Sequence, residues 1–218
     1  MLEIDSLIAG HDGRPAARLR HLALAGGQAA LLLGPSGSGK TSLLLTIAGL
    51  SESLGGSAKI DGVEVLALPR PERDRFRGRF IGLIFQDLHL VAGLSALDNL
   101  LLAPFAAGLP QDRRRALDLL DQLGLFDHAD RPAERLSRGE AQRVAIARAM
   151  LLRPKAILAD EPTASLDDQA CDQVAELLAR AAGSGDAALL IATHDQRLRR
   201  RFPVAVQAEP WPQRRSAA

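Results

Sequence analysis

Short apolar runs separated by polar and turn-forming residues recur along this chain. Five of them span residues 29–33, 80–85, 156–159, 188–193 and 204–206. Such runs, bounded by turn signals, are typical of strands that are buried on both faces of a parallel sheet. The pattern therefore predicts a mostly parallel sheet.

Helical patterns lie between these runs. They span residues 41–50, 112–125, 139–151 and 167–183. Asp112 is suited to capping the start of the second helix, and Gly124 favours its end. The alternation of strands and helices predicts an α/β fold, in which ligands bind beyond the carboxyl ends of the strands.

The chain between residues 87 and 152 contains no clear strand pattern. We interpret it as a helical subdomain inserted into a single α/β domain, whose core comprises residues 1–86 and 153–208. Residues 209–218 are rich in proline and polar residues and are expected to be loosely held. The basic run at residues 197–201 favours a solvated helix face over a site for an anionic partner.

The composition narrows the class of protein. The 218 residues are 47% hydrophobic and 24% charged, which is ordinary for a globular domain, and the net charge of +1 gives no reason to expect a nucleic-acid partner. Cys171 is the only cysteine, so no internal disulfide can form and a reducing compartment is favoured. No apolar run approaches the roughly 20 residues that a membrane-spanning helix needs, and the N-terminal stretch is too acidic for a signal peptide. We expect a cytoplasmic protein, for which a partner would supply any membrane span.

A glycine-rich loop follows the first apolar run and precedes the first predicted helix. Its sequence matches the pattern G-x-x-x-x-G-K-[ST], in which glycines let backbone N–H groups turn inward around a phosphate. Lys40 can then contact the β- and γ-phosphates of a nucleotide, and the Thr41 hydroxyl can bind Mg²⁺. A Gly-Ser turn that happens to hold Lys and Thr is the alternative, but the flanking strand and helix favour phosphate binding. The residues expected to bind the nucleotide here are Gly34, Pro35, Ser36, Gly37, Ser38, Gly39, Lys40, Thr41 and Ser42.

Polar residues follow three more of the apolar runs. Asp160 and Glu161 come directly after residues 156–159. In a nucleoside-triphosphatase of this fold, a carboxylate at this position holds Mg²⁺ and its neighbour can orient and deprotonate the attacking water. An acidic pair after a strand is often only the start of a polar loop, but the nearby phosphate loop favours the chemical role. Gln86 and His194 also follow apolar runs, so we expect them at the same edge of the sheet.

Six motifs in this order resemble those of the ATP-binding-cassette ATPase family over essentially the whole chain. They are the Walker A loop GPSGSGKT (34–41), Gln86 of the Q-loop, the signature LSRGE (136–140), the Walker B segment AILADE (156–161), the D-loop ASLD (164–167) and the switch His194. The sequences around Gln86, the signature and the D-loop look most like the subgroup that drives lipoprotein-release and macrolide-export type transporters. The resemblance implies a RecA-like P-loop NTPase core with a mostly parallel sheet, N-terminal antiparallel strands and an inserted helical subdomain.

The resemblance also implies a role for each motif in the hydrolysis of ATP with Mg²⁺. Thr41 and Asp160 would serve the metal, and Gln86 would touch Mg²⁺ or the attacking water and sense the membrane partner. Glu161 would be the general base, and His194 would contact the γ-phosphate and hold the geometry of Glu161 and the water. Members of the family work as head-to-tail dimers, so this chain would form a homodimer or pair with a related subunit. The residues that would act across the dimer interface are Ser137, Gly139 and Asp167.

A transmembrane permease subunit is the implied partner, which would place this chain on the inner face of the cell membrane. Residues 87–135 would dock a helix of that partner, with Leu90 and Leu94 as candidate contacts, although the apolar stretch 91–105 fits the core of the helical subdomain equally well. A cassette that drives signalling or mechanical work at the membrane without transport stays open as an alternative. A DNA-maintenance or translation cassette is disfavoured, because those need a long coiled coil or a second cassette.

The sequence departs from the family pattern at two places that bear on ATP. It contains no tyrosine, and the aromatic residue that stacks on adenine falls near His11, whose imidazole offers a smaller ring. Arg138 stands where the signature usually has its first glycine. Arg138 is either a solvated residue at the helix start or an added positive charge near the second ATP.

Overall fold

The five predicted strands pair in one parallel sheet of the computed structural model, which describes residues 1–164 and 166–212. In spatial order they are β6 (Ile81–Ile84), β7 (Ala156–Asp160), β8 (Ala188–Thr193), β3 (Ala29–Leu33) and β9 (Ala205–Gln207). Each neighbouring pair is parallel. Every residue of β7 and β8 is buried, as expected for central strands covered on both faces.

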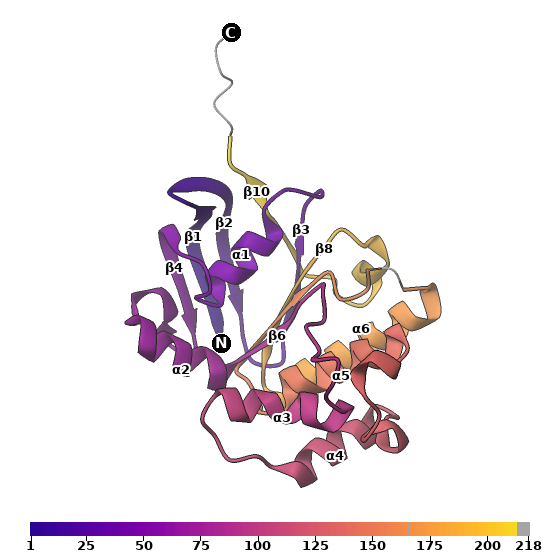
Figure 1. Cartoon of the computed structure of the whole chain (residues 1–218). Coiled ribbons are helices and arrows are strands. Elements are labelled where there is room, and N and C mark those ends of the chain that lie inside the picture. The colour runs from indigo at the N-terminus through magenta and orange to yellow at the C-terminus, as the bar shows by residue number, and fades with distance from the viewer. Residues whose placement is uncertain (165, 213–218) are drawn as a thin grey trace.

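A second, antiparallel sheet stands beside the parallel one (Figure 1). Its order is β10 (Glu209–Pro210), β2 (Arg14–Leu24), β1 (Leu2–His11), β4 (Ser53–Ile60) and β5 (Val63–Glu64). All four neighbouring pairs are antiparallel. The predicted fold class, an α/β core with N-terminal antiparallel strands, is therefore confirmed.

Helix α1 (Lys40–Ile47) lies between the two sheets and contacts strands of both. Successive side chains of a strand point to opposite faces, so each strand of the parallel sheet serves two cores. Leu32 packs toward α1 and the antiparallel sheet. Leu31 packs on the other face, with α6 (Asp168–Gly185). This sandwich fixes the carboxyl ends of β3, β7 and β8 relative to the start of α1.

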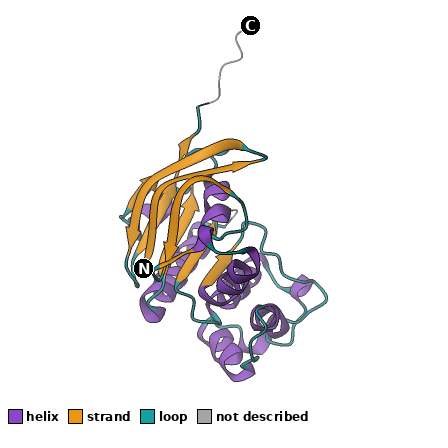
Figure 2. Cartoon of the chain, turned by 90° about the vertical axis from the view of Figure 1, so that its left-hand side faces the viewer, coloured by secondary structure: helices purple, strands orange, loops and turns teal. Residues whose placement is uncertain are grey.

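Residues 87–152 are helical and contain no strand. They form α3 (Ala96–Ala106), α4 (Arg113–Gln122) and α5 (Arg138–Met150), with short 3-10 turns at Phe126–His128 and Ala133–Arg135. These helices pack around a third core of their own, and Figure 2 shows helices gathered at the end of the molecule away from the antiparallel sheet. Asp112 accepts a hydrogen bond from the Arg115 N–H at 2.9 Å, and Gly124 has a φ of 65°, so both predicted ends of α4 are confirmed.

Two segments differ from the predictions. Residues 70–80 form helix α2 (Arg70–Phe80), which the apolar pattern did not indicate because none of its residues is buried; Phe80 ends this helix, and β6 begins at Ile81. The expectation that the chain is loosely held from Glu209 is wrong for residues 209–211. Glu209–Pro210 pairs with Arg18 and Ala17 of β2, and the Trp211 N–H donates to Ala16 O at 2.9 Å.

The remaining predicted tail, residues 213–218, lies outside the described residues. Short 3-10 turns also occur at Val65–Ala67 and Gln196–Arg200. Among the described residues, no helix combines the length and the apolar character needed to cross a membrane.

Candidate functional site

The glycine-rich loop between β3 and α1 packs closely against β2. Gly37 and Gly39 have φ angles of 77° and 82°, in the left-handed region that favours glycine. A Cβ atom on Gly39 would lie 2.4 Å from the Cβ of Ala17. Gly39 caps α1 without a side-chain hydrogen bond, and the first turn of the helix holds no acidic residue. The N–H groups at the start of α1 are thus available to an anion.

The ammonium group of Lys40 lies against the same loop. Lys40 is buried, and its Nζ donates to Gly34 O at 2.9 Å and to Pro35 O at 3.2 Å. A buried positive charge beside free helix N–H groups attracts a multiply charged anion such as a triphosphate. The geometry therefore suits the phosphate chain of a nucleotide.

A second polar pair lies where β7 meets α1. The Thr41 hydroxyl donates to Asp160 Oδ2 at 2.7 Å, and burial raises the pKa of Asp160. The other carboxylate oxygen, Asp160 Oδ1, is buried without a hydrogen-bond partner among the described residues, as is Ser38 Oγ. Unpaired buried oxygens next to a phosphate loop fit the ligand preference of Mg²⁺.

The described residues contain no group of three or more His, Cys, Asp or Glu side chains that could hold a metal ion. A Mg²⁺ ion at a nucleotide site does not need such a group. Mg²⁺ is usually held there by one or two protein oxygens, and substrate phosphates and water complete its coordination. The hydroxyl of Thr41 and the carboxylate of Asp160 are oxygen ligands of the kind that such a site uses.

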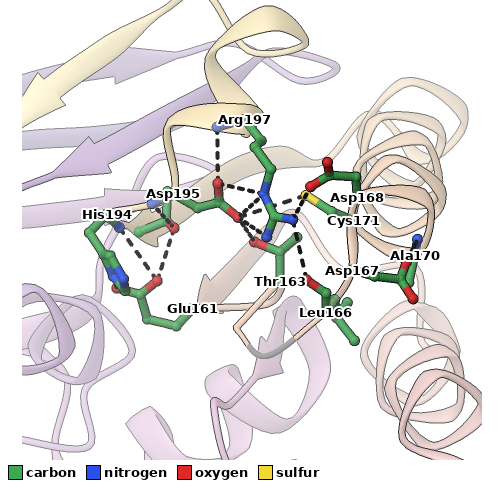
Figure 3. Close-up of polar contacts among 11 residues, drawn as sticks. Glu161, Thr163, Leu166, Asp167, Asp168, Ala170, Cys171, His194, Asp195 and Arg197 are labelled. Carbon is green, nitrogen blue, oxygen red and sulfur yellow. Dashed lines mark hydrogen bonds and ion pairs between the residues drawn. The ribbon is translucent and has the colours of Figure 1, made fainter.

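Three side chains hold the Glu161 carboxylate at the end of β7. Figure 3 shows His194 beside it. The Thr193 hydroxyl donates to Oε2 at 2.9 Å, while His194 Nδ1 lies 2.7 Å from Oε1. Lys40 Nζ lies 3.5 Å from the same Oε1. A hydrogen bond between the ring and a carboxylate requires the proton on Nδ1 of His194, which leaves Nε2 free to accept when the ring is neutral.

The backbone of Glu161 contributes to this placement. Its φ of 43° is in the left-handed region, which costs a residue with a Cβ about 1–2 kcal/mol. The Glu161 N–H donates to Ala192 O of β8 at 2.8 Å, so the strained residue is fixed by the neighbouring strand. The structure thus brings together Lys40, Thr41, Asp160, Glu161 and His194, as the sequence predicted.

Two contributors to the site were missed from the sequence. Thr193 directly precedes His194, and its oxygen accepts from the Asp195 N–H at 2.9 Å while its proton goes to Glu161. The available signal was a hydroxyl residue at the carboxyl end of a strand whose next residue was already a candidate. Asp195 offered no such signal, because an acidic residue after a strand is usually only the start of a loop.

Gln86 and the signature are not joined to this cluster within the chain. Gln86 is exposed two residues beyond β6, and no hydrogen bond among the described residues connects it to Asp160 or Glu161. Ser137 starts α5 through a capping box: its N–H donates to Glu140 Oε2 at 2.7 Å, and its Oγ accepts from the Glu140 N–H at 3.3 Å. The Ser137 N–H bond lowers the pKa of Glu140. Gly139 lies in the first turn of the same helix.

Three other predicted residues lie apart from the cluster. Asp167 caps α6 by accepting a hydrogen bond from the Ala170 N–H at 2.8 Å. Ser165, two residues before it, lies outside the described residues. His11 ends β1 with its side chain 91% exposed, and its Nε2 lies 3.4 Å from Asp12 Oδ2. Arg138 is exposed as the first residue of α5.

A groove of about 540 Å³ lies between α2, β6, α3 and α5, away from the Glu161 cluster. Charged and polar residues in its lining are Asp74, Arg77, Arg79, His89 and Arg148, and its apolar lining includes Phe85, Leu102 and Ala106. Ala96, Leu97, Leu100 and Leu101 of the apolar stretch 91–105 are buried in the third core, whereas Val91 and Phe105 are exposed. Leu90 also packs partly buried against that core.

Comparison with known proteins gives consistent matches. The family described as ABC transporter matches residues 20–164. The lipoprotein-releasing system ATP-binding protein LolD 1 of Rhodopirellula baltica is 44% identical, over 84% of this chain and 81% of the relative. LolD 2 of Rhodospirillum rubrum is 43% identical, over 78% of this chain and 74% of the relative. The dimeric post-hydrolysis structure of the ATP-binding cassette MJ0796 with ADP and phosphate superposes with a TM-score of 0.83 at 29% identity, covering 96% of this chain and 94% of the other.

Proposed function

This chain belongs to the ABC transporter family and is an ATPase of that family, and from this premise we propose that Glu161 is its general base in a dimer that drives a membrane partner. The observation that carries the assignment is the Glu161 carboxylate, held 2.7 Å from His194 Nδ1 and 3.5 Å from Lys40 Nζ at the mouth of the phosphate loop. A general base must lie within hydrogen-bond reach of the water that attacks the γ-phosphate.

The phosphate chain would lie along residues 34–42, where the backbone N–H groups, Lys40 and the start of α1 face it. Thr41 and Asp160 would hold Mg²⁺, which supplies neutralisation of the charge on the phosphates. Gln86 would reach the metal or the attacking water once its loop closes toward the site. His194 would keep Glu161 oriented through Nδ1 and contact the γ-phosphate with the other edge of its ring.

A second copy of the chain would complete the site. Ser137 and Gly139 are not hydrogen-bonded to the phosphate loop of their own chain, and the similar cassette MJ0796 is a dimer in its solved structure. In a head-to-tail dimer, the N-terminus of α5 would point its positive end at the γ-phosphate bound by the partner. Asp167 would act at the same interface, and ATP would hold the dimer closed until hydrolysis.

The membrane partner would be a permease of the lipoprotein-release type, on the inner face of the cell membrane. The names of the two LolD relatives, lipoprotein-releasing system ATP-binding proteins, support this proposal. The groove beside α3 is the surface that would receive the partner, because its lining combines apolar and charged residues outside the nucleotide cluster.

The docking proposal is tested at Ala106, which is exposed in that groove. Ala106→Arg should lower the ATPase activity stimulated by the partner at least fivefold, because the long side chain fills the groove, while basal ATPase stays unchanged. Asp121→Arg adds an arginine to an exposed position on α4, outside the groove, and serves as the control. Equal loss of basal and stimulated activity, or equal effects of the two variants, would place docking elsewhere.

The catalytic proposal is tested with Glu161→Gln, which keeps the size of the side chain and its contact with Thr193 but removes the base. ATP turnover should fall at least a hundredfold while ATP binding remains, and the ATP-bound chain should accumulate as a dimer in size-exclusion chromatography. Glu52→Gln, at an exposed loop position, is the matched control and should keep full turnover. Turnover of Glu161→Gln near the level of the unmodified chain would refute the general-base assignment.

A further inference from the structure

Arg197 connects the loop that follows β7 to the loop that follows β8 (Figure 3). Its Nη1 donates to Asp168 Oδ1 at 2.7 Å and to Leu166 O at 3.2 Å. On the other side, its Nη2 donates to Asp195 Oδ2 at 2.8 Å, and its Nε donates to Asp195 Oδ1 at 3.0 Å. One guanidinium group therefore joins residues 166–168 to residue 195.

Asp195 is the fixed centre of this contact. Besides Arg197, it accepts a hydrogen bond from the Thr163 hydroxyl at 2.9 Å, and Thr163 is fully buried. The hydrogen bonds from Arg197 lower the pKa of Asp195 to about 2, so the carboxylate stays ionised at any pH at which the chain would work. A bidentate pair of this kind fixes orientation as well as position, because the planar guanidinium has a set fork geometry.

The contact reaches the proposed base through one hydroxyl. The Asp195 N–H donates to Thr193 Oγ1 at 2.9 Å, and Thr193 Oγ1 donates to Glu161 Oε2 at 2.9 Å. A hydroxyl has a single proton, and the N–H of Asp195 already occupies one acceptor site on the Thr193 oxygen. The hydroxyl proton is thereby directed at Glu161, as long as the backbone at Asp195 stays in place.

We propose that Arg197 is a positioning residue for ATP hydrolysis, which clamps the loop carrying Glu161 against the loop carrying His194. The inference rests on the proposed role of Glu161 as the general base. Arg197 touches neither that carboxylate nor the phosphate loop; it acts through Asp195 and Thr193. It also holds Leu166 and Asp168 on either side of Asp167, the cap of α6, so the clamp ties the start of that helix to the same two loops.

The interpretation of the basic run at residues 197–201 as a solvated face holds for Arg199 and Arg200, which are exposed, but not for Arg197. Arg197 is 38% exposed and makes contacts on both sides, and Arg201 forms an ion pair with Glu176 of α6. Arg201 therefore also joins this segment to α6, but it reaches neither the Glu161 loop nor Asp195. The chain thus provides its own matched control, an arginine four positions away with a different partner.

The test compares Arg197→Gln with Arg201→Gln. Turnover is expressed per ATP-binding site, counted with a fluorescent ATP analogue, so that loss of folded protein does not imitate loss of catalysis. Arg197→Gln should lower kcat at least tenfold with KM for ATP changed less than twofold, since the loop geometry changes but the phosphate loop does not. Arg201→Gln should keep kcat. Unchanged kcat in Arg197→Gln, or equal losses in both variants, would overturn the proposal.

A coupling measurement adds a readout that general destabilisation would not give. Asp168→Asn should lower kcat a few-fold, and the double variant Arg197→Gln, Asp168→Asn should be no slower than Arg197→Gln alone, because both remove the same clamp. Multiplied losses would contradict a shared clamp. Arg197→Lys should recover only part of kcat, because an ammonium group lacks the planar fork; full recovery would reduce the role to charge alone and overturn the clamp geometry.

Glu161→Gln distinguishes a failure of the proposed general base from a failure of the proposed clamp. If Glu161→Gln abolishes turnover while Arg197→Gln leaves it unchanged, the clamp is wrong and the proposed base stands. If Glu161→Gln keeps turnover, the proposed base fails. A loss of turnover in Arg197→Gln would then have to act through another group that accepts the proton of the attacking water.

Discussion

The packing of Gly39 against Ala17 makes a quantitative prediction about the phosphate loop. Gly39→Ala should destabilise the chain in two ways. A φ of 82° costs a residue with a Cβ about 1–2 kcal/mol. The new Cβ would also lie 2.4 Å from the Cβ of Ala17, and relieving such an overlap in a packed interior costs about 1–3 kcal/mol.

Gly37→Ala separates the two costs. Gly37 has a similar φ of 77°, but a Cβ at this position would meet nothing within 4 Å. Gly37→Ala should therefore lose about 1–2 kcal/mol from the backbone alone. The free energies of unfolding of the two variants should then differ by about 1–3 kcal/mol, which is the steric cost.

Ala17→Gly supplies the rescue. Without the Ala17 Cβ, the nearest atoms to a Cβ on Gly39 are Ala17 Cα at 3.5 Å and Ala16 C at 3.6 Å, which are ordinary contacts. Ala17→Gly alone should cost about 0.5–1 kcal/mol, but it should stabilise the chain that carries Gly39→Ala.

The assay is urea unfolding without nucleotide, which gives a free energy of unfolding for each variant if the m-value is unchanged. Equal unfolding free energies for Gly37→Ala and Gly39→Ala would refute the reasoning about Ala17. So would a double variant that is less stable than Gly39→Ala alone, because it would show that the two side chains do not compete for space.

Three further predictions concern ATP and acid. Lys40→Ala should weaken ATP binding at least tenfold in equilibrium dialysis, because it removes the buried ammonium at the loop; intact affinity would contradict the phosphate-loop assignment. His11→Tyr should tighten ATP binding about two- to tenfold but leave tripolyphosphate binding unchanged, since a larger ring stacks only on the base; equal changes for both ligands would argue against adenine stacking. The pKa of Asp195 is about 2 in the folded chain and near 3.8 in the unfolded chain. The ionised carboxylate therefore stabilises the folded chain above about pH 4, and this contribution is lost as the pH falls through 2. The stability difference between the unmodified chain and Asp195→Asn, measured by urea unfolding, should narrow by up to about 2 kcal/mol over that range; a difference that stays constant would show that Asp195 is not paired as described.

The central strands were predictable because their apolar runs are buried on both faces, and burial of this kind leaves a continuous signal in the sequence. Helix α2 left no such signal, since none of its residues is buried. The pairing of β10 with β2 was missed for a related reason. A strand of two residues containing proline is held by its backbone partners, which a pattern of side chains does not reveal.

The candidate site likewise contains residues that the sequence predicted and residues that it did not. Residues 34–42, Asp160, Glu161 and His194 were found because their chemistry lies within short motifs or at strand ends. The Arg197 clamp depends on two loops about 30 residues apart that meet in space, and its arginine was indistinguishable in sequence from its basic neighbours. The orientation of the Thr193 proton likewise follows from the backbone at Asp195, which has no side-chain signature.

The position of β3 in the parallel sheet has a consequence for how the protein is made. The phosphate loop follows β3 early in the chain, but the two strands that flank β3 are β8 and β9, which are synthesised roughly 150 residues later. At a translation rate of about 5–20 residues per second, β3 would wait on the order of 10–30 s on the ribosome for its neighbours. A nascent chain that ended before β8 would carry the whole glycine-rich sequence without the sheet that supports it. Such a chain should not retain ATP, so nucleotide capture would begin only after β8 and β9 have been synthesised.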